Sequence, residues 1–386
     1  MIAGMKTARY LAATLIAALP LAAHAQDLTL ETIMDDPDWL GNAPENAYWG
    51  SDSRHVFFQQ KRQGSKLRDL YSVDTSDGAV AQVAEADWSS LSRSGVVYSE
   101  AGDLHAWVYS GDIYMSDGKS VRQVTRTSAT ESGPFFMADG RRIGFQLDQQ
   151  FHVFDPASGL TEQVTDVRFE KDPAQEDDFD VMRAHQERLY EQLRRVERDE
   201  QEARERADAL YDLDAALPPA PVYFGDDVEF EGQSLSPDGR RLIVITSAKG
   251  FDDGAAGTMP NYVTLSGHVE TRELRTRVGR NGRAPHSIWL VDLESGERSQ
   301  IAMDELPGID DDPLADLRKS AIEFYVNEGE DRDAAEKRLE APEQRGAEVW
   351  SISWTDDGAN VALYVRANDN KDRWIATIDF EEEQLV

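Results

Sequence analysis

The sequence contains no cysteine, which excludes disulfides, thiolate metal sites, thiol nucleophiles and lipid anchors on cysteine. Basic residues are also scarce, because 40 Lys and Arg stand against 73 Asp and Glu, for a formal charge of −33. That charge disfavours binding to nucleic-acid phosphates or to an anionic membrane surface, so we expect no nucleic-acid partner and no membrane anchor. The 40% of hydrophobic residues in a chain of 386 is enough for a sizeable core, which excludes global disorder.

Long apolar runs are missing too, and the one apolar stretch at the amino end is short. It extends from Tyr10 to Ala23, after Lys6 and Arg9, and Ala23–Ala25 follows it as an A-x-A motif. A membrane-spanning helix would need roughly 17–25 apolar residues. The pattern is instead that of a secretory signal peptide over residues 1–25, cleaved between Ala25 and Gln26. We therefore expect a periplasmic or secreted protein.

One motif recurs along the body of the chain: an apolar or aromatic residue, a tight turn with Asp and usually Gly, and then a β-rich run. Asp-Gly between apolar runs is the strongest short-range signal for a β-hairpin. The four copies span 49–58, 136–145, 235–245 and 354–364.

A second motif follows, in which a strand ends in Asp, a Gly-containing turn comes next, and a last strand ends near a β-branched residue. Its copies span 70–83, 113–125, 151–165 and 288–301. Two hairpins make a four-stranded antiparallel unit, and repeats of such units at roughly 35–45 residues are typical of β-propeller blades.

The sequence thus predicts an all-β fold, an incomplete β-propeller of about four and a half four-stranded blades out of an expected eight. After the signal peptide come a segment over 26–47 and the partial propeller over 48–386. We expect blades at 48–83, 88–125, 134–166 and 234–301, and a fifth from Val349 that stops after its third strand at 374–379. Because an open arc exposes strand edges, we expect the chain to be the amino-terminal part of a longer protein.

Two stretches break the β pattern and predict helical insertions, at about 174–213 and 313–340. The first has apolar residues at spacings of seven, four and three, which favours a long helix with one narrow apolar stripe. It is either a charged arm without a site, or an arm that docks on a second subunit as a homodimer contact or guards a substrate entrance. The second insertion gives no functional signal.

No catalytic or cofactor motif occurs in the sequence. It lacks G-x-S-x-G, H-E-x-x-H, a P-loop and G-x-G-x-x-G, so we assign no catalytic residue, no metal ligand and no cofactor. The histidines lack mutual ligand spacing, and the acidic clusters lack the order of a calcium loop, so solvated turns explain these clusters better.

The insertion within the fourth blade, at 249–285, concentrates positive charge in an acidic protein. It contains five arginines: Arg272, Arg275, Arg277, Arg280 and Arg283. Guanidinium groups bind carboxylate or carbonyl oxygens in a forked geometry, so this cluster is a candidate substrate-binding site for a peptide. The alternative is simple pairing with the acidic surface.

Four stretches resemble the amino-terminal region of secreted bacterial prolyl oligopeptidase-family serine peptidases, in particular the dipeptidyl peptidase IV-like branch. They span 28–37, 49–52, 236–240 and 369–374, and the phrase Leu28–Pro37 is the most telling. The resemblance implies an eight-bladed propeller above a carboxyl-terminal α/β-hydrolase domain, which would lie beyond Val386 and carry the Ser-Asp-His triad. It also implies paired glutamates that hold the amine of the substrate, but no stretch matches that motif.

The leading hypothesis is therefore the propeller portion of an exported serine peptidase, inactive alone, with a peptide substrate and its own hydrolase domain as partners. A non-enzymatic periplasmic binding propeller is the alternative. A lyase or glycosidase with two acids in a central channel is a third.

Overall fold

The computed structural model describes residues 29–34, 37–91, 95–173, 190–213, 217–252, 254, 256–276, 282–341 and 345–386. The expected signal peptide at 1–25 and the part of the first helical insertion before Tyr190 lie outside these ranges. The chain divides into two compact units, residues 1–88 and 89–386, which are described separately.

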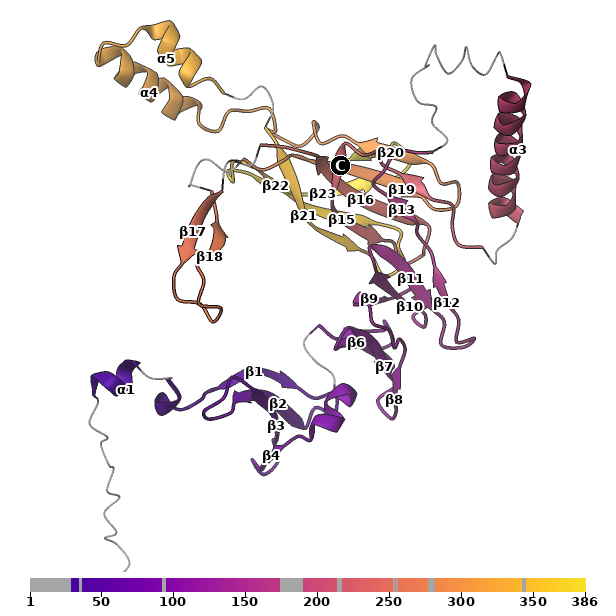
Figure 1. The fold of residues 1–386 in the computed structure, drawn as a ribbon, viewed down its shortest axis with the longest axis vertical. Helices are drawn as coiled ribbons and strands as arrows, with labels where there is room; N and C mark the ends of the chain where they lie inside the picture. The colour runs from indigo at the N-terminus through magenta and orange to yellow at the C-terminus, as the bar shows by residue number, and fades with distance from the viewer. Residues whose placement is uncertain are drawn as a thin grey trace, which may run out of the picture. The chain divides into compact units, whose positions relative to one another are not determined.

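The first unit contains one four-stranded antiparallel sheet, which we call the first sheet (Figure 1). A short helix α1 (Leu30–Met34) and a 3₁₀ turn (Pro37–Leu40) precede it. Its strands are β1 (Pro44–Trp49), β2 (His55–Lys61), β3 (Arg68–Asp74) and β4 (Val80–Gln82). A second 3₁₀ turn (Glu85–Ser90) follows.

The second unit contains four more four-stranded sheets, each with its strands in chain order. The second sheet consists of β5 (Val97–Tyr98), β6 (His105–Tyr109), β7 (Asp112–Ser116) and β8 (Val121–Gln123). The third consists of β9 (Ser132–Phe136), β10 (Ile143–Leu147), β11 (Gln150–Phe154) and β12 (Thr161–Gln163). The fourth consists of β15 (Val228–Leu235), β16 (Arg241–Ala248), β19 (His286–Asp292) and β20 (Arg298–Ile301). The fifth consists of β21 (Ala347–Trp354), β22 (Val361–Ala367), β23 (Arg373–Asp379) and β24 (Gln384–Leu385).

This arrangement confirms an all-β fold of four-stranded, propeller-type sheets. The count of four and a half blades needs one correction. The fifth sheet has a fourth strand, because β24 pairs with β23 through Leu385 and Ile378. This strand is only two residues long, too short to give a sequence signal.

Consecutive sheets of the second unit pack on one another through three apolar clusters. The apolar run of β16 is unbroken because both faces of the strand are buried. Leu242 and Val244 pack toward the third sheet, whereas Ile243 and Ile245 pack toward the fifth. A strand buried on both faces requires apolar residues at every position instead of alternation. The second and third sheets meet in the same way, through residues such as Ile113.

The same turn joins the first and second strands of all five sheets. The backbone N–H of its fourth residue donates to the carbonyl of the first, and the N–H of the first donates to the carbonyl two residues after the turn. We call these the inner turns: 50–53, 99–102, 137–140, 236–239 and 355–358. Glycine occupies the fourth position with positive φ in four of them, and Ser53, with φ of 54°, occupies it in the first sheet.

Three insertions interrupt the repeat of four-stranded sheets in the described part of the chain (Figure 1). The first contains α3 (Glu191–Leu213), and its ends are brought together by a parallel pair, β13 (Val167–Arg168) with β14 (Val222–Tyr223). The second is a hairpin within the fourth sheet, β17 (Gly257–Asn261) and β18 (Glu270–Leu274). The third contains two helices, α4 (Ala315–Asn327) and α5 (Arg332–Arg338), separated by a turn that includes Gly329.

Candidate functional site

A cavity of about 430 Å³ lies where the first strands of the second to fifth sheets come together, and we call it the axial pocket. Aromatic rings line much of it, including those of Tyr98, Phe135 and Trp354. Tyr98 is 59% exposed, and its ring packs against His105 at a centroid distance of 5.7 Å. The pocket therefore offers aromatic surface that is open to solvent, which favours a ligand with an apolar or planar part.

The second residues of four inner turns all line this pocket: Glu100, Ala138, Pro237 and Asp356. The turns of neighbouring sheets touch, since the N–H of Ala138 donates to the carbonyl of Pro237 over 2.8 Å. One residue from each of four sheets thus comes to the same cavity. Two of the four are acids, and they come from the second and fifth sheets.

These two acids differ from the other turn carboxylates, which stabilise their own turns. Asp357 is typical: its Oδ1 accepts hydrogen bonds from the Thr355 hydroxyl and from the N–H of Ala359. Those bonds lower the pKa of Asp357. Among the described residues, no hydrogen-bond or ion-pair partner is found for the side chains of Glu100 and Asp356, and both residues are exposed. Their carboxylates are therefore available to a ligand.

A second cavity of about 240 Å³ shares Gln233 and Ser234 with the axial pocket, and we call it the bulge pocket. It is named for two β-bulges, which place the extra residues Glu231 of β15 and Trp350 of β21 at its wall. Bulges redirect side chains and are frequent beside functional sites.

His286 lies in the wall of the bulge pocket as a neutral imidazole. Its Nδ1 accepts a hydrogen bond of 3.0 Å from the N–H of Val349, so the ring proton is on Nε2. Burial lowers the pKa of His286, although the carboxylates of Glu231 and Glu348 act in the opposite direction. This side chain is thus a hydrogen-bond donor at neutral pH, not a cation.

A buried carboxylate supports the exposed ring of Trp350. Glu348 is 7% exposed and accepts from Nη1 of Arg283 at 2.7 and 2.9 Å. Burial alone would raise the pKa of Glu348, but hydrogen bonds from Trp350 and Arg283 outweigh it and lower the pKa. Arg366 completes the group, with its guanidinium 4.5 Å from the Trp350 ring centroid.

Three of the five arginines of the candidate cluster lie in the described ranges, and no partner common to these three is found there. Arg283 pairs with Glu348, as described. Arg272 lies on β18 near Met259, and Arg275 is exposed just after that strand. Arg277 and Arg280 lie outside the described residues.

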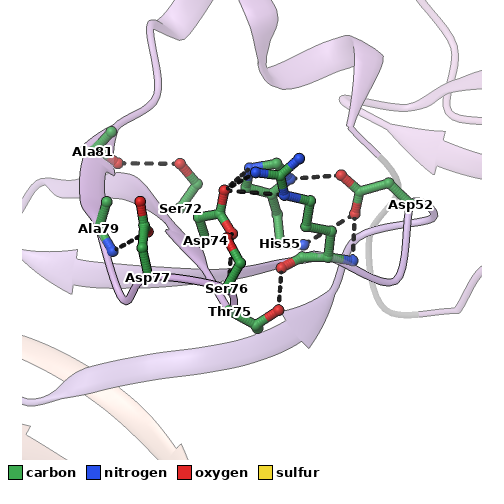
Figure 2. Close-up of polar contacts among 10 residues, drawn as sticks. Asp52, His55, Ser72, Asp74, Thr75, Ser76, Asp77, Ala79 and Ala81 are labelled. Atoms are coloured by element: carbon green, nitrogen blue, oxygen red, sulfur yellow. Dashed lines mark hydrogen bonds and ion pairs between the residues drawn. The ribbon is translucent and has the colours of Figure 1, made fainter.

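The first sheet has a polar cluster of its own, shown in Figure 2. Nδ1 of His55 lies 2.5 Å from a carboxylate oxygen of Asp52, and Arg54 donates to Asp74 at 2.6 and 3.0 Å. Nε2 of His55 lies 3.9 Å from Oδ2 of Asp74. The arrangement therefore ties the inner turn to the β3–β4 turn.

Two further features bear on the site. Within the described ranges, no group of three or more His, Cys, Asp or Glu side chains is arranged to hold a metal ion. In the same part of the chain, no helix has the length and apolar character needed to cross a bilayer.

Sequence reasoning misses the two pocket acids and the bulge-pocket residues. In the sequence, Asp356 is only one residue of a turn, and Glu100 lies in a turn, Ser99–Gly102, that lacks the Asp-Gly signature. Alignment of the five inner turns places Glu100 and Asp356 at the second turn position. Only the structure shows that this position faces the pocket.

No family model and no curated protein sequence matches the chain. Solved structures do. Dipeptidyl peptidase 4 of Porphyromonas gingivalis is 11% identical with a TM-score of 0.40, over 94% of this chain and 42% of that one. The β-propeller domain of the Trilobed protease from Pyrococcus furiosus is 9% identical with a TM-score of 0.32, over 89% and 71%. TolB from Acinetobacter baumannii is 11% identical with a TM-score of 0.27, over 86% and 54%.

The similar structures thus include a dipeptidyl peptidase and the propeller domain of a protease. The chain spans less than half the length of the Porphyromonas enzyme. Likeness at this level of identity concerns the fold, so function is argued below from the chain's own residues.

Proposed function

We propose that this chain is the substrate-recognition and gating propeller of an exported serine peptidase that hydrolyses short peptides in the manner of a dipeptidyl peptidase. It supplies part of the substrate pocket and no nucleophile. The triad is provided by an α/β-hydrolase domain encoded after Val386. The signal-peptide pattern at residues 1–25 directs the protein to the periplasm or outside the cell.

The axial pocket is the observation that carries this proposal. A peptide needs apolar surface for its side chains and polar groups at fixed positions for its orientation. The pocket supplies both, through Tyr98, Phe135 and Trp354 on one hand and through Glu100 and Asp356 on the other. The walls of the pocket come from the first strands of four consecutive sheets. In a propeller, the blades surround a central channel, so the pocket corresponds to part of such a channel.

The arginines of the insertion form a second part of the proposal. Arg272 on the hairpin and Arg275 just after it are exposed and can hold a carboxylate or carbonyl group of a bound peptide. Arg283 supports the site indirectly, through its ion pair with Glu348. Exchange of Arg272 and Arg275 for alanine in the complete protein is expected to raise KM for peptides and to leave kcat unchanged.

The proposal is tested by expression of the reading frame from Gln26 to its natural stop, beside a product that ends at Val386. Both are assayed for hydrolysis of X-Pro chromogenic dipeptides. Activity of the long product alone assigns residues 26–386 to recognition and gating. If the natural stop is at Val386 and the folded product is inactive, the peptidase proposal fails.

The alternative is a non-enzymatic periplasmic propeller that binds a protein or peptide through the same pocket. The observation in its favour is that the pocket offers aromatic surface together with the exposed carboxylates of Glu100 and Asp356, a combination that suits binding without a catalytic step. This alternative predicts peptide binding by the 26–386 product without hydrolysis by any longer product of the gene. The helical arm that contains α3 is its candidate homodimer contact, which sedimentation of a variant without residues 174–213 tests.

A further inference from the structure

The acids at the axial pocket indicate the kind of peptide that it holds. In the four inner turns of the second unit, the second position is occupied by Glu100, Ala138, Pro237 and Asp356. Ala138 and Pro237 show that the turn itself requires no carboxylate at this position. Neither acid makes a hydrogen bond or ion pair among the described residues. The two charges are therefore unexplained by the fold.

The pocket that these acids line also has aromatic walls. Tyr98, Phe135 and Trp354 line the same cavity. The Trp354 indole is fixed by a hydrogen bond to Ser234, and the Phe135 ring packs edge-on against Phe151 at a centroid distance of 6.0 Å. Aromatic faces attract cations, and a planar guanidinium stacks on them better than an ammonium group does.

We propose that the axial pocket binds the arginine side chain of an extended peptide. The guanidinium pairs with Glu100 and Asp356, and its apolar stem packs between the aromatic walls. A guanidinium has five N–H donors in one plane, so it can serve two carboxylates that come from different sheets. The cavity of about 430 Å³ lies within the usual range for small-ligand sites. The formal charge of −33 adds long-range attraction for a cationic peptide.

This inference deepens the proposed function and names its substrate class, and it rests on that function only for the role of the bound peptide. The binding itself concerns residues of this chain. It is therefore measured on the purified chain without any hydrolase domain, with capped peptides that carry no terminal charge.

The test compares acetyl-Ala-Ala-Arg-Ala-Ala-amide with the same peptide containing citrulline, the neutral isostere of arginine, by calorimetry at two salt concentrations. We expect binding of the arginine peptide, a loss of about tenfold or more with citrulline, and weaker binding at high salt. Glu100→Gln and Asp356→Asn should each weaken binding of the arginine peptide by about three- to tenfold. Asp304→Asn is the control, because it removes an exposed acid that does not line the pocket, and it should bind as wild type does.

Equal affinity for the two peptides, no binding of the arginine peptide, or wild-type affinity of both pocket variants would overturn the inference. Failure of the proposed function looks different. If the chain binds the arginine peptide and the long product does not cleave peptides, arginine binding by the pocket is supported and the peptidase proposal is refuted. If the long product cleaves X-Pro substrates and the purified chain does not distinguish arginine from citrulline, arginine binding is refuted and the peptidase proposal is supported.

Discussion

The indole Nε1–H of Trp354 donates a hydrogen bond of 3.0 Å to the hydroxyl of Ser234, although the two residues are 120 positions apart in the chain. Trp354 ends the first strand of the fifth sheet, and Ser234 lies near the end of the first strand of the fourth. Both also line the axial pocket. The bond thus fixes a ring of the pocket wall and joins two sheets at their inner edges.

Trp354→Phe and Ser234→Ala should each lower the free energy of unfolding, by about 1 kcal/mol for the lost hydrogen bond. The phenylalanine variant loses further packing. Because each change removes the same bond, the double variant should be less destabilised than the sum of the two, with a coupling of about 1 kcal/mol. Urea unfolding of the four proteins measures this coupling. Strictly additive effects would show that the bond contributes nothing.

Ser53→Gly should stabilise the protein. Ser53 has φ of 54° at the fourth position of an inner turn, where the other four sheets have glycine. A side chain in the left-handed region costs roughly 1–2 kcal/mol, and the greater entropy of unfolded glycine offsets about 0.5–1 kcal/mol of the relief. We expect a net gain of about 0.5–1 kcal/mol in urea unfolding.

The matched control for this change is Gly102→Ser in the second sheet. Gly102 has φ of 69°, and no atom lies within 4 Å of the position that a Cβ would take, so a serine there would be strained in its backbone without a steric clash. This variant should be destabilised by about 1 kcal/mol. The same sign for both substitutions would contradict the explanation by backbone strain.

Asp52 should make the stability of the protein fall in acid. Partial burial alone would raise the pKa of Asp52, but hydrogen bonds from the His55 ring and from the N–H groups of His55 and Arg54 lower it to about 2. The unfolded carboxyl has a pKa of about 3.9. A folded pKa below the unfolded one gives stability that is complete above about pH 5 and is lost as the pH falls toward 2.

Asp52→Asn removes this contribution, so the difference in unfolding free energy between wild type and variant should be largest near pH 6 and shrink toward pH 2. Urea midpoints measured across that range give the difference directly. Asp304→Asn, at an exposed acid in the second unit, serves as the control for charge alone. A difference that stays constant with pH would rule out the pKa as the cause.

Arg283→Ala should destabilise the protein, whereas Arg272→Ala should not. Removal of Arg283 takes away the closest cation and leaves the buried Glu348 carboxylate with the hydrogen bond from Trp350 and with Arg366, whose Nε lies 3.8 Å away. The Arg283 side chain is 47% exposed, which reduces the expected loss to about 1–2 kcal/mol. Thermal unfolding of both variants would separate them, and equal losses would mean that the ion pair with Glu348 is not the reason.

Gly144→Ala tests the wall of the axial pocket. A Cβ at position 144 would overlap the Phe135 ring, so the ring must move or the sheet must shift. We expect a loss of about 1–3 kcal/mol, the usual result of overpacking. Gly232→Ala on β15 is the control, because nothing lies within 4 Å of its Cβ, and it should unfold as wild type does. If Gly144→Ala were equally well tolerated, Phe135 would not be fixed where it lies.

The repeat of hairpins could be predicted because a tight turn requires specific residues. In Asp139–Gly140 and Asp238–Gly239, the glycine adopts the positive φ of the turn, and the aspartate carboxylate accepts hydrogen bonds from backbone N–H groups. The first sheet shows the limit of this reasoning, since Ser53 performs the same role at an energetic cost and does not give the usual signal. Trp49, the Gly50 and Asp52 of the turn and the strand that follows still indicate this turn in the sequence.

The candidate site could be predicted only in part. The arginines of the insertion stand out because of their composition, yet only the pairing of Arg283 with Glu348 shows what one of them does, and position 348 is far away in sequence. Glu100 and Asp356 have the opposite property: their local sequence is unremarkable for a turn. Their common position depends on how four sheets pack, which is a long-range property of the fold.

Arg345 has a consequence for the helical insertion that contains α4 and α5. Its side chain is 6% exposed, binds Asp369 and Asp372 in the β22–β23 turn, and donates to the carbonyl of Gly308 at the other end of the insertion. The two ends of the insertion are thereby held together at its base. A protease that cut the chain among these helices would leave a nicked molecule whose fourth and fifth sheets stay associated, so this segment can be lost, replaced or fused to another domain without opening the core.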